Sequence, residues 1–160
     1  MTEKEILEFI AEWRWGTIHA VDGNKPYGVE VAYASDDDYL YCGSKPGGRM
    51  AQCIKSNPNI AFKLCDSDPE HKKWRAAIIE GVAERITNKD DILFFVRLLA
   101  KKMGRPEHSF DALADKIAEN PDDSNSIRLP LKVMGGRTNW SLQPIKHITW
   151  PNEELPSSSN

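Results

Sequence analysis

Apolar side chains at the start of the chain recur three and four positions apart. They are Ile6, Leu7, Phe9, Ile10 and Trp13. This spacing is typical of an amphipathic helix that buries one side. Thr2, with Glu5 three positions further on, predicts a capping box at the beginning of that helix.

The pattern then changes to the alternation that β-strands show. Residues 15–21 predict a first strand, and Asp22-Gly23-Asn24 predicts the turn that ends it. Apolar residues at every second position of 29–33 predict a second strand, and residues 39–42 predict the returning strand of a hairpin. Three consecutive aspartates, Asp36, Asp37 and Asp38, lie between these two strands and are interpreted as solvated turn residues, without the spaced ligands of a calcium loop.

The middle of the chain combines a short helix with two further strands. The helix is expected to bury Met50 and Ile54 and to end at Asn57-Pro58, because the residue before a proline avoids the helical region. The two strands are expected at residues 60–65 and 74–86. Gly81 is expected to mark a bulge or a sharp bend in the second of them.

The last part of the chain predicts two helices and a set of closing strands. The helices are expected at residues 90–103 and 110–118, and the strands at 127–134, 138–142 and 145–150. Antiparallel strands with inserted helices favour a mainly β, α+β fold: a barrel or sandwich with flanking helices, rather than a parallel sheet. We expect one domain over residues 1–150 and a flexible tail over 151–160. The sequence assigns no role to the helical insert at 104–126.

Composition excludes several classes of function. The chain has 160 residues, 40% of them hydrophobic, and a net charge of −3 without a basic stretch. One domain of this size can bury a core of its own, and neither nucleic acid nor a membrane is an expected partner. The acidic N-terminus does not resemble a leader sequence, so a cytoplasmic location is expected. The cysteines Cys42, Cys53 and Cys65 lack zinc-site spacing and are expected to be buried thiols; no metal site is predicted.

The segment from Tyr41 to Met50, YCGSKPGGRM, carries the most informative chemistry. A strand ends there, a glycine-rich turn follows, and a helix begins beside Arg49. Backbone N–H groups at such a helix start favour an anion, and an arginine can grip a phosphate with two hydrogen bonds. The spacing is neither that of a Walker loop nor that of a Rossmann fingerprint, and a purely structural turn remains an equal alternative.

Several segments together resemble the flavin-binding split β-barrel of the pyridoxamine 5'-phosphate oxidase-like superfamily. They are Gly16-Thr17, residues 26–31 (PYGVEV), residues 39–44 (YLYCGS) with Gly48-Arg49 and Asn57-Pro58, and residues 80–83 (EGVA). The chain looks closest to the nitroimidazole-resistance-like branch. The resemblance covers residues 5–84 well and 138–150 more loosely.

This resemblance implies FMN as the cofactor and a set of residues around it. The backbone of Val29, Glu30, Val31 and Ala32 would lie along the isoalloxazine ring. Tyr41, Cys42, Gly43 and Ser44 would flank the ribityl chain and the ring edge, while Gly48, Arg49 and Met50 belong to the phosphate loop. The family binds flavin at a homodimer interface, where Trp140 of a second copy could reach the ring.

Two positions depart from the family pattern. Met50 stands where a lysine is common, which removes one phosphate-neutralising charge, although Lys45 can substitute from the loop. Cys42 and Gly43 replace bulkier residues, so contacts with the ring can differ.

The resemblance implies an FMN-dependent oxidoreductase that reduces a small electron acceptor, with NAD(P)H as a candidate donor. No catalytic residue is assigned, because none of the four histidines has a partner carboxylate at recognisable spacing. Three alternatives stay open: a flavin-binding or electron-carrier module without its own turnover, a split barrel that binds haem or a deazaflavin, and a barrel that has lost its ligand, which Met50 in place of the lysine leaves open. The Gly-Gly-Arg turn favours a phosphate-bearing ligand over haem, because no histidine stands in an obvious axial position.

Overall fold

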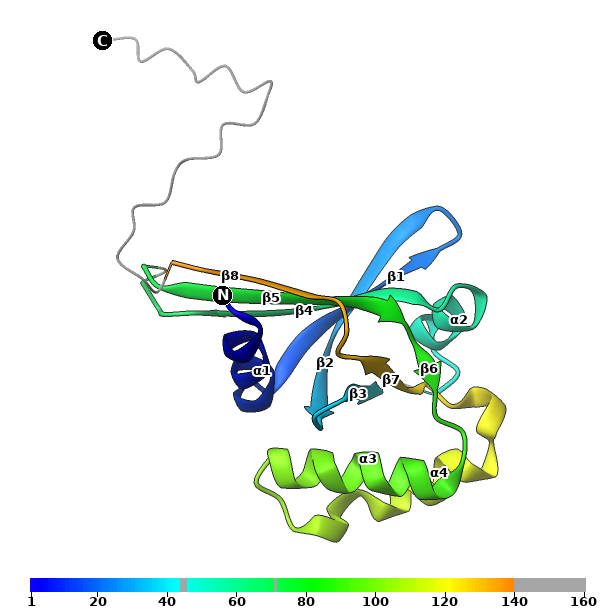
Figure 1. Ribbon diagram of the computed structural model, residues 1–160. Helices are drawn as coiled ribbons and strands as arrows, with labels where there is room; N and C mark the ends of the chain where they lie inside the picture. Colours follow the sequence, from blue (N-terminus) through cyan, green and yellow to red (C-terminus); the bar gives the residue numbers. More distant parts are fainter. Residues whose placement is uncertain (44–45, 71, 140–160) are drawn as a thin grey trace, which may run out of the picture.

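The computed structural model describes residues 1–43, 46–70 and 72–139. Its described strands form one antiparallel sheet in the order β6-β7-β3-β2-β1-β4-β5-β8, which curls as a half-barrel (Figure 1). The strands are β1 (Trp15–Asp22), β2 (Lys25–Ser35), β3 (Tyr39–Gly43), β4 (Asn59–Ser67), β5 (Trp74–Val82), β6 (Glu84–Arg85), β7 (Ser126–Pro130) and β8 (Met134–Thr138). The helices are α1 (Glu3–Glu12), α2 (Arg49–Ser56), α3 (Lys89–Lys102) and α4 (Asp111–Glu119), with single 3-10 turns at Glu107–Phe110 and Pro121–Asp123.

The first helix forms as its sequence predicts. The Glu5 backbone N–H donates to Thr2 Oγ1 at 3.3 Å, and the Thr2 N–H donates to Glu5 Oε2 at 2.6 Å, which completes a capping box. Ile6, Phe9 and Ile10 are buried against the sheet. The expected amphipathic helix is therefore confirmed.

The long hairpin of β1 and β2 is also confirmed. Its strands pair without interruption from Trp15 opposite Ala32 to Asp22 opposite Lys25. Gly23 occupies the turn with φ +62°, a conformation that costs glycine little and other residues more. The hairpin tip projects beside α2 (Figure 1).

The main core fills the concave side of the curled sheet. Tyr33 and Phe62 meet edge to face at its centre, with ring centroids 5.3 Å apart. The Tyr33 hydroxyl and the Lys102 ammonium both donate to the Ile10 carbonyl oxygen, at 2.8 and 2.7 Å. Burial, and after it the charge of Arg14, lowers the pKa of Lys102 to about 8. Through Lys102, the end of α3 is therefore joined to α1 and to the barrel core.

A second apolar cluster joins the helical pair α3 and α4 to β3. The Tyr41 ring stacks on Phe95, with centroids 6.2 Å apart, and meets Phe94 edge to face. Arg97 of α3 forms two hydrogen bonds with Asp111 of α4, at 2.8 and 3.1 Å. Much of the insert at 104–126, for which no role is predicted from the sequence, therefore becomes a layer packed beside the sheet (Figure 1).

The structure corrects the prediction for residues 74–86. The strand does not bulge at Gly81 but breaks at Ala83, whose N–H donates to the Pro58 carbonyl oxygen at 2.8 Å. The chain thereby leaves its partner β4 and pairs through β6 with β7. Gly81 serves close packing instead, because a Cβ there would lie 3.2 Å from the Leu129 side chain.

The closing strands differ from the prediction as well. The expected strand at 127–134 ends at Pro130, and a turn at 131–133 leads into β8. β8 begins at Met134 rather than at residue 138. The expected strand at 145–150 and the expected tail at 151–160 lie outside the described residues. No helix in the described ranges is long and apolar enough to span a membrane.

The close approach of β1 to β4 at Gly16 makes a stability prediction. A Cβ on Gly16 would lie 2.3 Å from Phe62 Cε1 and 2.8 Å from the Lys63 carbonyl oxygen. We expect Gly16→Ala to lower the free energy of unfolding by about 1–3 kcal/mol, because buried ring and backbone must move. Gly135→Ala is the matched control, since its Cβ meets only Ile78 Cγ2 at 3.8 Å. Equal urea midpoints for the two variants would contradict this.

Candidate functional site

The site forms where β2 and β3 part. β3 pairs with β2 only at residues 33–35, and β3 ends at Gly43. No described strand pairs with residues 29–32 of β2 on that side, while β1 pairs with them on the other. In an antiparallel strand, alternate residues direct their N–H and C=O groups to opposite sides. β2 therefore offers an open row of backbone hydrogen-bonding groups at the positions expected to lie along the ring.

Two clefts meet at Val31, next to this open edge. The first has a volume of about 390 Å³ and the second about 190 Å³. The first is lined by Tyr27, Val29, Glu30, Val31, Gly48, Arg49 and Met50. The structure thus brings the expected ring segment of β2 and the expected phosphate loop to one cleft.

Arg49 carries the positive charge of the first cleft. Its Nε and Nη2 each lie 2.8 Å from Asp22 Oδ2, at the tip of the β1–β2 hairpin. Its guanidinium also lies over the Tyr27 ring, 4.1 Å from the centroid. Sequence reasoning missed Asp22 as a partner of Arg49, because only the fold brings the hairpin tip to α2.

The beginning of α2 lies in the same cleft and is open to an anion. Gly48 occupies the N-cap position without a side-chain hydrogen bond, and no acidic residue lies in the first turn. By contrast, α1 and α3 are capped by Thr2 and Asn88 and carry acidic residues in their first turns. Uncapped N–H groups and the helix dipole favour a negative group at this point.

Met50 lines the same cleft but cannot supply charge. Its side chain is buried and packs in the main core with Cys53 and Ile54. The expected substitute, Lys45, and the expected site residue Ser44 lie outside the described residues. Among the described residues of the loop and of α2's first turn, Arg49 is the cation that can meet a phosphate.

The second cleft has an apolar wall built by the helical pair. Ala32, Gly43 and Pro46 form one side of it. Apart from Val31, the rest of the described lining comes from α3, α4, the residue before β7 and the first residue of β7: Phe95, Val96, Leu99, Leu113, Ile117, Asn125 and Ser126. The described lining carries no charged side chain. Sequence reasoning missed this wall; the pair Asn125-Ser126, polar but buried, was visible in the sequence only as part of a polar linker.

Tyr41 and Cys42 line neither of these two clefts. The Tyr41 hydroxyl donates to Asp36 Oδ2 at 2.7 Å. Burial, together with the bond to Asp36, raises the pKa of Tyr41. Burial opposes ionisation of Asp36, but the bonds from Tyr41 and from the Tyr39 and Asp38 N–H groups outweigh it and lower the pKa of Asp36. Burial raises the pKa of Cys42 to about 12.

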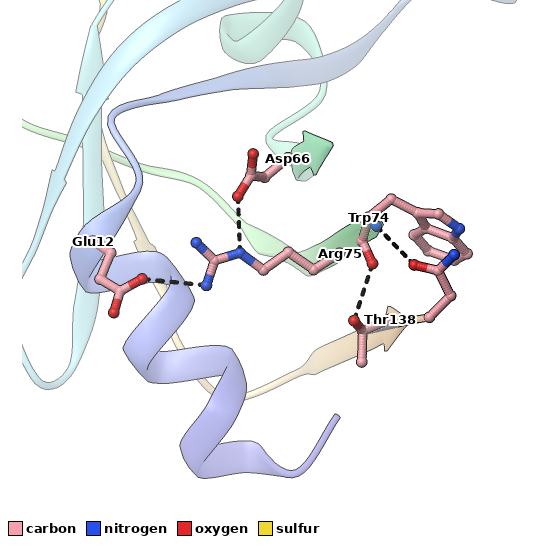
Figure 2. Close-up of polar contacts among 6 residues, drawn as sticks. Glu12, Asp66, Trp74, Arg75 and Thr138 are labelled. Atoms are coloured by element: carbon pink, nitrogen blue, oxygen red, sulfur yellow. Dashed lines mark hydrogen bonds and ion pairs between the residues drawn. The ribbon is translucent and has the colours of Figure 1, made fainter. Parts of the chain in front are cut away.

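The end of the described chain is held at the start of β5. The Trp74 N–H donates to Asn139 Oδ1 at 2.7 Å, and the Thr138 hydroxyl donates to the Trp74 carbonyl oxygen at 3.0 Å (Figure 2). The neighbouring Arg75 bridges Glu12 of α1 and Asp66 of β4. This end of the sheet lies away from α2 (Figure 1). The expected site residue Trp140 itself lies outside the described residues.

The described residues hold no group of three or more His, Cys, Asp or Glu side chains that could bind a metal ion. His108 lies 2.9 Å from Asp111 but on the exposed side of the helical pair, outside both clefts. Among the residues that the structure describes, no histidine lines either cleft.

Comparison with known proteins identifies the class. The pyridoxamine 5'-phosphate oxidase family model matches residues 2–138, so the chain belongs to this family. The expected resemblance and the split-barrel fold are both confirmed.

Solved structures and a curated relative agree with this fold. A conserved hypothetical protein of Mycobacterium tuberculosis has a TM-score of 0.75 at 19% identity and covers 96% of this chain and 95% of its own. A putative 5-nitroimidazole antibiotic resistance protein of Bacteroides thetaiotaomicron has a TM-score of 0.70 at 16% identity; the match covers 86% of this chain and 84% of that protein. A FAD-binding protein of Mesorhizobium loti has a TM-score of 0.60 at 20% identity, covering 86% and 93%. An uncharacterized protein of Rhizobium meliloti strain 1021 is 24% identical over 81 residues, about half of each chain.

The structure corrects one expectation about the cysteines. Cys42 and Cys53 are buried as expected, but Cys65 is exposed. In β4 the residues Ile60, Phe62 and Leu64 point into the core, so the alternation of the strand turns Cys65 outward.

This difference predicts selective thiol labelling. At pH 8 we expect iodoacetamide to modify Cys65 in the folded protein and to spare Cys42, because Cys42 is inaccessible and its pKa is raised to about 12. Mass spectrometry of the labelled peptides measures this. Cys65→Ser should abolish the fast reaction, and rapid labelling of Cys42 would contradict the arrangement.

Proposed function

We propose that the protein binds FMN in the two joined clefts. The observation that carries the proposal is the meeting of Arg49 and the uncapped start of α2 with the open edge of β2. A phosphate would lie against Gly48 and Arg49, and the isoalloxazine ring along the backbone of residues 29–32. Support comes from the Mesorhizobium loti relative and from a Mycobacterium smegmatis protein of similar fold, both described as FAD-binding.

The residues present fit such a ligand. A flavin needs an anion site, a planar slot with polar edges and an apolar face, and the clefts combine these three features. Arg49 and the α2 N–H groups would neutralise the phosphate. Val31 joins the anion site to the apolar wall of α3 and α4, which would exclude water from one side of the ring.

We further propose an oxidoreductase that passes electrons to a small, uncharged acceptor. Bound flavin supplies the hydride or electron transfer, so the protein needs no nucleophile or general base of its own. The chain's contribution is to orient the ring and, through β2 N–H groups, to stabilise negative charge on it. The uncharged described lining of the second cleft favours a neutral acceptor over an anionic one. The protein of similar fold described as a putative 5-nitroimidazole antibiotic resistance protein also supports a small, uncharged acceptor.

A homodimer is part of this proposal. Trp15, Ile78 and Val82 are 49%, 39% and 54% exposed, and the strand registers place them on one outer sheet face together with Glu30 and Ala32. A second copy packed there would bury these apolar groups beside the open edge of β2. It could also bring its own Trp140 to the ring, as the family pattern implies.

Sedimentation velocity measures the assembly directly. We expect a species of twice the 18.1 kDa chain mass at micromolar concentration. Ile78→Lys should shift it towards the monomer, because a cation would then be buried in the interface. A wild-type protein of single-chain mass would contradict the dimer.

The phosphate site is tested by titrating the protein with FMN. We expect Arg49→Ala to weaken FMN binding by about 1–3 kcal/mol, because a charge-assisted contact is lost. Flavin fluorescence quenching gives the affinity. Arg105→Ala is the control, since this exposed cation lines a separate groove on α3. Riboflavin, which lacks the phosphate, should bind both variants as it binds the wild type.

Turnover is tested on the same FMN-loaded protein. Oxidation of NADH or NADPH coupled to a quinone or a nitroaromatic compound would support the oxidoreductase. Stable binding of FMN without any such turnover would favour the flavin carrier. Equal FMN affinity of wild type and Arg49→Ala would remove Arg49 from the site.

A further inference from the structure

Asp22 forms an ion pair with Arg49, the cation that the proposed function assigns to the flavin phosphate. Its Oδ2 accepts a hydrogen bond from Arg49 Nε at 2.8 Å and lies 2.8 Å from Nη2 of the same guanidinium in an ion pair. Asp22 is the last residue of β1 and pairs with Lys25 across a turn in which Gly23 has φ +62°. The tight turn fixes the direction in which this carboxylate leaves the hairpin.

This contact places a negative charge next to the proposed anion site. A phosphate that approaches the Nε–Nη2 edge of Arg49 must displace the Asp22 carboxylate. A phosphate on the remaining edge lies near that carboxylate, and two like charges in such proximity repel. In both arrangements the charge of Asp22 opposes binding of the phosphate.

Asp22 is not the only group that holds the guanidinium. The Tyr27 ring supports it from its face at 4.1 Å from the centroid. An asparagine at position 22 would retain an oxygen that accepts from Arg49 Nε while losing the charge. The effect of the charge can therefore be separated from the effect of the hydrogen bond.

We propose that Asp22 is a built-in competitor of the flavin phosphate, which makes the flavin exchangeable rather than permanently held. The inference rests on the proposed function. Met50 is buried and carries no charge, so Arg49 is the cation among the described residues at the start of α2. No second cation among those residues of the first turn offsets the charge of Asp22. Asp22 and Arg49 are both half-exposed, so the competition is modest and depends on salt.

The test compares wild type and Asp22→Asn in FMN and riboflavin titrations at low and high salt. We expect Asp22→Asn to bind FMN about three- to tenfold more tightly at low salt, as removal of one exposed like charge implies. Riboflavin affinity should not change, and high salt should shrink the difference. The gain should shrink in an Arg49→Ala background, where no guanidinium remains to compete for and only the like-charge repulsion by Asp22 is left.

Asp37→Asn is the matched control. It makes the same charge change at an exposed position in the turn before β3, at the opposite end of that strand from the phosphate loop. It should leave FMN affinity unchanged. Thermal unfolding of each variant verifies that the fold is intact.

The outcomes separate the two proposals. If wild type binds FMN and Asp22→Asn binds it equally or more weakly, Asp22 is not a competitor, and the flavin site stands. If Asp22→Asn binds FMN and wild type does not, the competition is supported and wild-type flavin function is lost. If neither protein binds FMN, both proposals are overturned. An equal gain for riboflavin or for Asp37→Asn would also overturn the role of Asp22.

Discussion

The clefts and the helices of the site are arranged around the parting of β2 from β3, which leaves β2 without a described partner on that side at the residues before Tyr33. A strand with an unpaired edge leaves backbone donors and acceptors without partners, which is costly where water is excluded. Here β1 continues to pair with residues 25–32 on one side, while the chain beyond Gly43 turns away on the other. The resulting gap is where both clefts and the start of α2 meet.

The helices determine what kind of ligand suits this gap. α2 presents an uncapped N-terminus and Arg49 at one end, which favours a phosphate. α3 and α4 present apolar side chains at the other, which favours a planar aromatic group. Lys102, bound to the Ile10 carbonyl oxygen, fixes the far end of α3 to α1. The apolar wall of the second cleft is thus attached to the barrel in two places: through Lys102 at the end of α3, and through the packing of α3 against β3.

Local rules explain why much of the fold could be predicted from the sequence. The capping box at Thr2, the turn at Gly23 and the burial of Met50 each follow from residues close together in the chain. The break of the strand at Ala83, where the chain changes its partner from β4 to β7, could not be predicted from the sequence. It depends on a hydrogen bond to Pro58 and on pairing with β7. An alanine carries no local signal for such a change of partner.

The same distinction holds for the site. The loop around Gly48 and Arg49 has a recognisable local pattern, and the structure brings it to the segment of β2 expected beside it. The contact of Arg49 with Asp22 and the wall that includes Asn125 arise from tertiary packing between distant segments. For Cys65 the local sequence is misleading. Its apolar neighbours favour a buried thiol, but the alternation of side chains along β4 turns it outward.

The proposed ligand of this cleft is flavin mononucleotide. The most direct measurement is the visible absorption spectrum of the purified protein, with the mass of any ligand released on denaturation. We expect flavin bands, present on purification or restored by added FMN, and a released mass equal to that of FMN. A colourless protein that also fails to bind added FMN would overturn the proposed flavin site, and a Soret band would assign the cleft to haem instead.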